Sequence, residues 1–298
     1  MEVTKISPQG YCKGVIVALK KCISAINDSN LPRPIYLLGM PIHNKKVSAA
    51  LEKKGLIVLK DKKRLAMLDE IQNGTVIISA HGASKHVFEK AMLKGLTIID
   101  ATCDSVRKIQ DTLRKTNKHI LYIGTNGHSE SEAILTEFNN VTLIENNDAI
   151  TNLNADIAYL ATNQTTMSIF DTEEKYQKIK DHCHNVETIN LICNATTQRQ
   201  KALMNQTADL IVIVGDRHSS NTQKLFEIAL SQTKHQLTIK VETVEDLASL
   251  NLTYYQTAIV TSGASTPKAI TNEIVEYLQQ YPNKKAISNL TTDDYLTF

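Results

Sequence analysis

The sequence predicts an α/β protein built from three related domains with mostly parallel sheets. Short apolar, β-branched runs alternate with amphipathic helical patterns along the whole 298-residue chain. The runs are continuously apolar, which is typical of parallel strands covered by helices on both faces. Similar motifs recur at intervals of about 90 residues, so the three domains are expected to surround a pseudo-threefold axis.

Nine apolar runs of five or six residues are expected to form the strands. They are 35–39, 75–79, 96–100, 119–124, 141–145, 157–162, 189–193, 210–215 and 258–263. Two of the intervening helices show a clear apolar stripe, formed by Val106, Ile109 and Leu113 and by Ile270, Ile274 and Leu278. Pro267 is expected in the first turn of the second of these helices, where a proline costs no hydrogen bond.

The repeat is visible in three independent series of residues. In the first, a strand ends in glycine and a polar residue opens a helix four positions later: Gly39 and His43, Gly124 and His128, Gly215 and Ser219. In the second, SAHGAS (79–84), ATNQTT (161–166) and TSGAST (261–266) each follow an apolar strand. In the third, Cys12, Cys103 and Cys193 are 91 and 90 residues apart. We therefore expect domains at 1–102, 103–192 and 193–283, followed by a tail at 284–298.

Composition excludes several classes of function. The net charge of +2 argues against a strongly basic nucleic-acid binder, and no apolar run approaches the ~20 residues that span a bilayer. The N-terminus lacks the apolar core of a signal peptide, so we expect a cytoplasmic protein with no nucleic-acid or membrane partner. In that compartment, five cysteines point to a metal, a cluster, catalysis or simple burial rather than to disulfides.

The polar motifs predict a site for a small, strongly anionic ligand such as a phosphate ester or a diphosphate. Each motif lies where a parallel strand ends and a helix begins, and helix N-termini attract anions. The expected lining is His43, His81, His128, Glu130, Thr165, Ser219, Ser220, Asn221 and Ser265. Glu130 in GHSESEA (127–133) is a candidate proton donor, and Glu132 competes for the same role.

The three evenly spaced cysteines predict a cluster site at the same axis. No C-x-x-C pair is present, so each domain would contribute one thiolate. Because iron–sulfur clusters normally have four cysteine ligands, three thiolates around four irons would leave one iron open to a substrate. Cys22 lies on an apolar helical stripe and is assigned to the core, and Cys183 has no partner at ligand spacing.

Taken together, the motifs resemble one known family over essentially the whole chain, the 4-hydroxy-3-methylbut-2-enyl diphosphate reductases. The matching motifs are GYCKGV (10–15), PIHN (41–44), SAHG (79–82), DATC (100–103), GHSESE (127–132), NQTT (163–166), ICNATTQRQ (192–200), SSNT (219–222) and SGASTP (262–267). The chain departs from the family at Ser129, where proline is common, and at Lys13, where a small residue is common. The tail after Ile287 matches least well.

The resemblance implies a trefoil of three α/β domains around one 4Fe–4S cluster per chain, with Cys12, Cys103 and Cys193 as its ligands. It implies that a ring of polar side chains holds the substrate diphosphate: His43, His81, His128, Ser219, Ser220, Asn221 and Ser265. Glu130 would deliver protons, and Thr165 would lie near the substrate hydroxyl. The implied reaction removes that hydroxyl with two electrons and two protons, yielding isopentenyl and dimethylallyl diphosphates, with a ferredoxin or flavodoxin as electron donor.

Two alternatives belong to other classes. One is a zinc-dependent hydrolase of phosphate esters that uses the same thiols and histidines. The other is a non-catalytic iron–sulfur sensor that binds a diphosphate metabolite. Metal analysis distinguishes the first alternative from a reductase, and turnover with a strong one-electron donor distinguishes the second.

Overall fold

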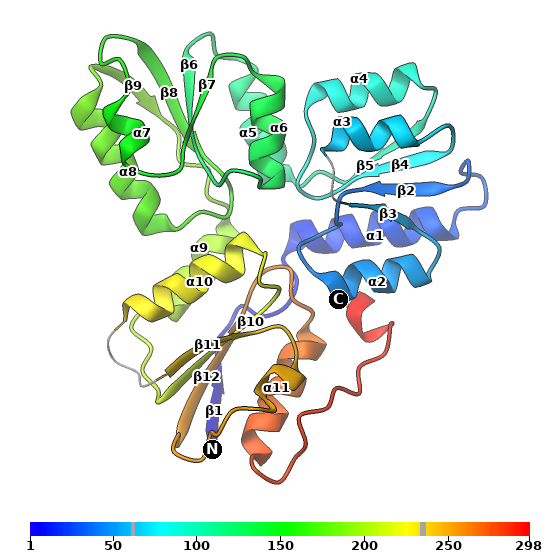
Figure 1. The fold of residues 1–298 in the computed structure, drawn as a ribbon, viewed down its shortest axis with the longest axis vertical. Coiled ribbons are helices and arrows are strands. Elements are labelled where there is room, and N and C mark those ends of the chain that lie inside the picture. Colours follow the sequence, from blue (N-terminus) through cyan, green and yellow to red (C-terminus); the bar gives the residue numbers. More distant parts are fainter. Residues whose placement is uncertain (61–62, 233–236) are drawn as a thin grey trace. The chain divides into compact units, whose positions relative to one another are not determined.

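The computed structural model describes residues 1–60, 63–232 and 237–298, which form two compact units. The first unit contains Met1–Ile16, Ile42–Lys53 and Asn194–Phe298. The second contains Val17–Pro41 and Lys54–Cys193. Three separate four-stranded sheets, all with parallel pairing, lie in these units (Figure 1), one in the first unit and two in the second. The predicted α/β class with parallel sheets is confirmed.

The sheet of the first unit has the strand order β1-β12-β10-β11. Its strands are β1 (Glu2–Lys5), β10 (Leu210–Val214), β11 (Leu237–Val241) and β12 (Thr257–Ser262). The helices of this unit are α2 (Lys45–Lys53), α9 (Asn194–Leu203), α10 (Ser220–Ser231) and α11 (Lys268–Gln280), and α1 (Lys13–Asn27) begins in it.

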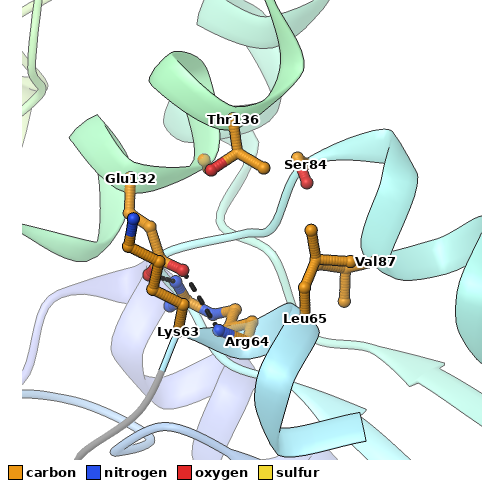
Figure 2. Close-up of a pocket in the computed structure, with 8 residues that line it drawn as sticks. Lys63, Arg64, Leu65, Ser84, Val87, Glu132 and Thr136 are labelled. Carbon is orange, nitrogen blue, oxygen red and sulfur yellow. Dashed lines mark hydrogen bonds and ion pairs between the residues drawn. The ribbon is translucent and has the colours of Figure 1, made fainter. Parts of the chain in front are cut away.

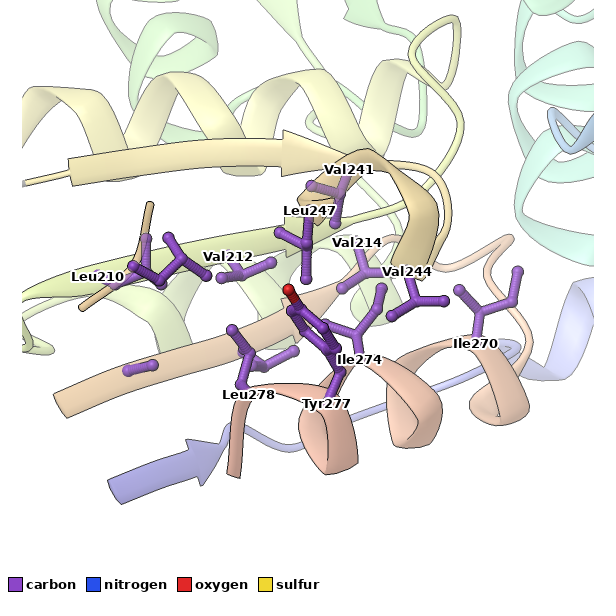
Figure 3. Close-up of a cluster of buried hydrophobic side chains, with 13 residues drawn as sticks. Leu210, Val212, Val214, Val241, Val244, Leu247, Ile270, Ile274, Tyr277 and Leu278 are labelled. Carbon is purple, nitrogen blue, oxygen red and sulfur yellow. The ribbon is translucent and has the colours of Figure 1, made fainter. Parts of the chain in front are cut away.

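Strand β10 shows why this sheet needs helices on both faces. Leu210, Val212 and Val214 pack in one buried cluster with α11 (Figure 3). Ile211 and Ile213 pack in a second cluster, with side chains of α9 and α10. Because successive strand residues point to opposite faces, a continuously apolar strand buries both sets only if each face is covered.

The second unit carries two sheets with the same internal order. One is β3-β2-β4-β5, from β2 (Ile35–Leu38), β3 (Ile57–Leu59), β4 (Thr75–Ile78) and β5 (Thr97–Asp100). The other is β7-β6-β8-β9, from β6 (His119–Ile123), β7 (Val141–Ile144), β8 (Ala158–Asn163) and β9 (Asn185–Thr188). The helices of this unit are α3 (Arg64–Met67), α4 (Lys85–Leu93), α5 (Asp104–Leu113), α6 (Ser129–Glu137), α7 (Asp148–Thr151) and α8 (Ile169–His182), with a 3-10 turn at Leu68–Glu70.

The strand order makes the internal repeat explicit. In both sheets of the second unit the strands are arranged second, first, third, fourth in chain order. The remaining sheet follows the same rule when read as β11-β10-β12, and β1 occupies the position of the fourth strand. The N-terminal strand therefore completes the C-terminal sheet, although residues 1–102 were expected to form one domain. The boundaries at 102, 192 and 283 stay a prediction.

Eight of the nine predicted strands are present within one or two residues of their expected ends, and one prediction is wrong. The run at 189–193 is a loop, and the strand lies earlier, at Asn185–Thr188. Ile189 and Leu191 still bury against the core beside Ile120 and Tyr122, but as loop residues. The Leu191 amide donates to the side chain of Asn163 in β8, at 3.0 Å from Oδ1, instead of to a backbone carbonyl of a neighbouring strand. The apolar run therefore anchors the loop that ends at Cys193.

Smaller expectations are also settled by the structure. Pro267 is the N-cap of α11 rather than a residue of its first turn. Cys22 is 1% exposed in α1, and Cys183 is buried in the cluster that contains Tyr159 and Ile179. The tail packs on the first unit, where Ala286, Leu290 and Tyr295 contact the α11 cluster. Among the described residues, no helix has the length and apolar character needed to cross a bilayer.

Candidate active site

Glu130 is a buried carboxyl group in the first turn of α6. Its side chain accepts two hydrogen bonds from Thr165, one from the backbone N–H at 3.0 Å and one from Oγ1 at 2.7 Å. Burial raises the pKa of Glu130 to about 6, and the two bonds from Thr165 act in the opposite direction. A carboxyl group with this pKa exchanges protons near neutral pH, as a general acid requires.

His128 precedes Glu130 and caps α6. The Glu130 amide donates to His128 Nδ1 at 3.2 Å, so Nδ1 acts as the acceptor and a neutral ring carries its proton on Nε2. The His81 ring packs edge-on against His128, with centroids 5.7 Å apart. His81 follows β4, and its Nδ1 lies 3.5 Å from Ser79 Oγ. Two imidazoles with N–H donors beside a buried acid suit an anionic ligand with an exchangeable proton.

Glu132 belongs to a different interaction. Its carboxylate pairs with the Arg64 guanidinium at 2.9 Å and also accepts from the Arg64 backbone N–H at 3.1 Å. The Arg64 side chain is 3% exposed, so Glu132 is the counter-charge of a buried cation. This geometry favours Glu130 over Glu132 as the proton donor.

The first unit gathers a second set of the expected residues. Ser219 caps α10 by accepting from the Thr222 amide, and its Oγ lies 3.4 Å from Ser265 Oγ. Ser265 Oγ also donates to the His43 carbonyl at 3.3 Å. Ser220 is the first residue of α10. The hydroxyl groups of Ser219 and Ser265 thus lie together at a helix N-terminus, which favours anion binding.

Asn221 carries the clearest sign of a ligand in this unit. Its residue is 3% exposed, and within the described part of the chain neither Oδ1 nor Nδ2 has a hydrogen-bond partner. Leaving a buried amide unsatisfied costs about 1–3 kcal/mol per group, so such amides normally have a partner. A bound ligand would supply it.

Two glycines let the strand ends approach this helix closely. A Cβ atom at Gly215 or Gly263 would collide with the side chain of Thr222 in the first turn of α10. A side chain would not fit at either position, which explains why both residues are glycine.

The three evenly spaced cysteines share one local environment. Cys12, Cys103 and Cys193 are each half-buried and lie directly before α1, α5 and α9. Their backbone N–H groups donate to Ala264, Ala80 and Thr165 carbonyls at 3.0–3.1 Å. The positive end of a helix dipole stabilises negative groups, so these positions suit the thiolates that bind iron. By contrast, burial raises the pKa of Cys22 to about 12, which keeps that thiol protonated. The three cysteines fit the predicted iron–sulfur ligands in chemistry, burial and local backbone.

Within the second unit, two of these backbone bonds lie next to residues of the candidate site. Thr165 donates to Glu130 and accepts from the Cys193 amide. Ala80, which accepts from the Cys103 amide, directly precedes His81. The structure thus brings His81, His128, Glu130 and Thr165 together where strands of the two sheets of this unit end, with backbone bonds to two of the three cysteines.

Arg64 lies beside the candidate site although no sequence motif predicts it there. It stands in a lysine-rich segment, DKKRLAM (61–67), that is typical of a solvated surface. In the structure it lines a cavity of about 210 Å³ beside α6 (Figure 2). The other lining residues are Lys63, Leu65, Ser84, Val87, Glu132, Ala133 and Thr136.

Comparison with known proteins gives a consistent result. A family model described as LytB protein matches residues 3–279. A 4-hydroxy-3-methylbut-2-enyl diphosphate reductase of Bacillus licheniformis is 40% identical over 294 residues, covering 95% of this chain and 92% of the relative. A protein of the same name from Macrococcus caseolyticus is 39% identical, with coverages of 94% and 90%.

Solved structures agree with the sequence relatives. The E-1-hydroxy-2-methyl-but-2-enyl-4-diphosphate reductase of Plasmodium falciparum is similar with a TM-score of 0.85 and 30% identity, covering 99% of this chain and 96% of the other. A second structure, described as the terminal enzyme of the non-mevalonate pathway, has a TM-score of 0.62 and 25% identity, with coverages of 94% and 99%. From the family match and the relatives at about 40% identity, we conclude that this chain belongs to the LytB family.

Proposed function

We propose that this chain catalyses the reductive dehydroxylation of 4-hydroxy-3-methylbut-2-enyl diphosphate to isopentenyl and dimethylallyl diphosphates. The observation that carries the proposal is the buried Glu130–Thr165 pair in a chain of the LytB family. Removing a hydroxyl group as water requires a proton at that oxygen. A carboxyl group whose pKa burial raises to about 6 is suited to hold this proton away from bulk water.

Thr165 has a positioning and relay role in this proposal. Its Oγ1 donates to Glu130 at 2.7 Å, so the hydroxyl oxygen retains lone pairs to accept from a substrate hydroxyl. To deliver a proton, the protonated Glu130 carboxyl group donates either directly to the substrate oxygen or to Thr165 Oγ1, and in the second case the Thr165 O–H turns to donate its own proton to the substrate oxygen. The backbone bond from Thr165 fixes the carboxyl group in one orientation.

The polar ring binds the diphosphate. His43, His81 and His128 supply ring N–H donors, and Ser219, Ser220, Asn221 and Ser265 supply hydroxyl and amide donors. The first turn of α10 adds backbone N–H groups and the positive end of its dipole. Holding the diphosphate fixes the position of the allylic carbon, an orientation effect that lowers the barrier of the chemical step.

Cys12, Cys103 and Cys193 would hold one 4Fe–4S cluster per chain. When bound, such a cluster supplies electrons one at a time and a Lewis-acidic iron without a cysteine ligand. The proposed electron donor is a ferredoxin or flavodoxin, and the proposed location of the enzyme is the cytoplasm. Nucleic acid and membrane are not among the partners that we propose.

Anaerobic metal analysis combined with activity tests the proposal. The purified protein should be brown and contain about four irons and four sulfides per chain. With dithionite-reduced methyl viologen it should convert the substrate to both products. Cys103→Ser and Cys193→Ser should lose iron and turnover, whereas Cys22→Ala should retain both because Cys22 is buried core.

The alternative functions give different results in the same experiment. Zinc in a colourless protein, together with phosphate release that needs no reductant, would establish a hydrolase. A full cluster with diphosphate binding and no turnover would establish a sensor. Either result would overturn the proposed reductase.

A further inference from the structure

Arg64 is a buried cation for which the proposed reaction has no direct use. It is the first residue of α3 and is 3% exposed. Taking a guanidinium group out of water costs several kcal/mol unless it is well paired. The burial of Arg64 therefore has to be explained by the groups that its guanidinium contacts.

The guanidinium group makes contacts in two directions, and Figure 2 shows the one toward Glu132. Toward α6, Nη1 donates to Glu132 Oε2 at 2.9 Å and to the Ser129 carbonyl at 3.3 Å. Toward β4, Nη2 donates to Ser79 Oγ at 3.4 Å. The backbone N–H of Arg64 adds a bond to Glu132 Oε1 at 3.1 Å.

Both directions lead to a histidine of the candidate site. Ser129 follows His128 in the chain, and Ser79 Oγ lies 3.5 Å from His81 Nδ1. The two imidazole rings are themselves in edge-on contact, with centroids 5.7 Å apart. One side chain thus ties together the two segments that present His81 and His128.

The chemistry of arginine suits this arrangement. Its planar fork can donate to groups on both sides at once and remains charged when buried. A lysine offers a single nitrogen and cannot keep both sets of contacts. The Arg64–Glu132 ion pair is therefore better explained by the positions in which it holds the neighbouring segments than by a gain in stability, because a buried ion pair adds little net stability.

We propose that Arg64 is a positioning residue that holds His81 and His128 at the spacing required to bind the substrate diphosphate. The inference rests on the proposed function for the identity of the ligand. It does not depend on turnover, because inorganic diphosphate can report on the same two histidines.

Arg114, the C-cap of α5, provides a matched control because it is a second arginine that pairs with a glutamate of α6. Its guanidinium donates to Glu137 at the end of α6, from Nε to Oε1 at 2.6 Å and from Nη2 to Oε2 at 3.1 Å. Replacing Arg114 loosens the C-terminal end of α6 and leaves the Arg64 contacts to the histidine segments in place. A general effect of loosening α6 would appear in both variants.

The experiment compares the wild type, Arg64→Ala, Arg64→Lys and Arg114→Ala as anaerobic holoproteins. It measures the affinity for inorganic diphosphate by calorimetry, and kcat and KM with the substrate. For Arg64→Ala we expect diphosphate affinity and KM to worsen about 10- to 100-fold, with a smaller change in kcat, because misplaced positioning groups weaken binding. Arg64→Lys should lie between this variant and the wild type, and Arg114→Ala should stay within about twofold of the wild type.

Guanidinium ion adds a rescue test. The cavity of about 210 Å³ beside Arg64 leaves room for the ion to enter once the side chain is removed. Millimolar guanidinium should restore part of the diphosphate affinity of Arg64→Ala and should not improve Arg114→Ala. Methylammonium, which lacks the planar fork, should restore less.

Several results would overturn the proposal. One is a folded Arg64→Ala or Arg64→Lys variant with wild-type diphosphate affinity and KM. Another is an equal loss of affinity in Arg114→Ala, which would reduce the role of Arg64 to anchoring the helix. If Arg64→Ala does not fold, Arg64→Lys carries the comparison alone. A wild type that binds diphosphate but does not turn over the substrate would refute the proposed function and leave the Arg64 comparison valid.

Discussion

Replacing Glu130 by glutamine should abolish turnover and, at the same time, change how stability depends on pH. Glutamine has nearly the same shape and can still accept a hydrogen bond from Thr165. It has no titratable proton. We therefore expect Glu130→Gln to bind cluster and substrate but to lose about 10²- to 10⁴-fold in kcat, the usual contribution of a general acid.

The effect on stability follows from the raised pKa. Burial raises the pKa of Glu130 from 4.5 to about 6 in the folded protein. Between these values the unfolded chain ionises while the folded protein retains its proton, so the group costs stability as the pH rises. A difference of roughly 1.5 units corresponds to about 2 kcal/mol, fully present above pH 6 and absent well below pH 4.5.

The glutamine variant lacks this cost. The free energy of unfolding of the wild type, relative to Glu130→Gln, should therefore fall as the pH rises. About 1 kcal/mol of this change is expected between pH 5 and pH 7.5, where both proteins can be compared. In a chain of this length, it corresponds to a relative shift of about 2 °C in melting temperature.

The assay measures unfolding of both proteins under anaerobic conditions at several pH values, together with kcat. Glu187→Gln is the matched control, because it makes the same chemical change at a side chain that is 52% exposed and so carries no comparable burial cost. The wild-type kcat should decrease above a pH of about 6, or higher if the bound diphosphate raises the pKa further. A stability difference that is constant from pH 5 to pH 7.5, or near-normal kcat in Glu130→Gln, would refute the reasoning.

Two further predictions concern residues outside this pair. Asn221→Ala should raise KM about tenfold or more without lowering the free energy of unfolding. The reason is that the amide removed is buried and has no partner among the described residues. An unchanged KM in steady-state kinetics would contradict the assignment of Asn221 to the diphosphate site. Glu137→Gln should lower the free energy of unfolding by about 1–3 kcal/mol, because the carboxylate accepts from Arg114 at 2.6 Å and from the Lys85 amide at 2.7 Å. Urea unfolding measures that loss, and kcat and KM should stay at wild-type values; a change in kinetics without a change in stability would speak against a structural role.

Much of the fold was predictable because its signal is local. Apolar runs that bury both faces of a strand are visible in the sequence, and eight of the nine expected strands are present. The exception, 189–193, is equally apolar, and its side chains are partly buried. An apolar run in the sequence indicates that its residues are buried, but it does not distinguish a buried loop from a strand. At 189–193 the two structures differ in the acceptor to which the Leu191 amide donates.

The pairing of strands that are far apart in the chain was harder to predict from the sequence. β1 joins β12, which is more than 250 residues away in the chain, and it completes the C-terminal sheet. The four residues Glu2–Lys5 have no continuous apolar run, because this strand lies at the edge of its sheet and is largely exposed. An edge strand needs less apolar surface, so its sequence signal is weak.

For the candidate site, the motifs in the sequence were enough to propose the set of residues and the repeat that relates them. Motif spacing identified the histidines, hydroxyl residues and cysteines at strand ends, because helix starts and strand ends have local signatures. The choice between Glu130 and Glu132 required the folded chain. The first meets Thr165 in a buried position and the second meets Arg64 as the counter-charge of a buried cation. Those partners lie 35 and 68 residues away in the chain, and the chemistry of a carboxyl group depends on burial and charge that only the folded chain brings together.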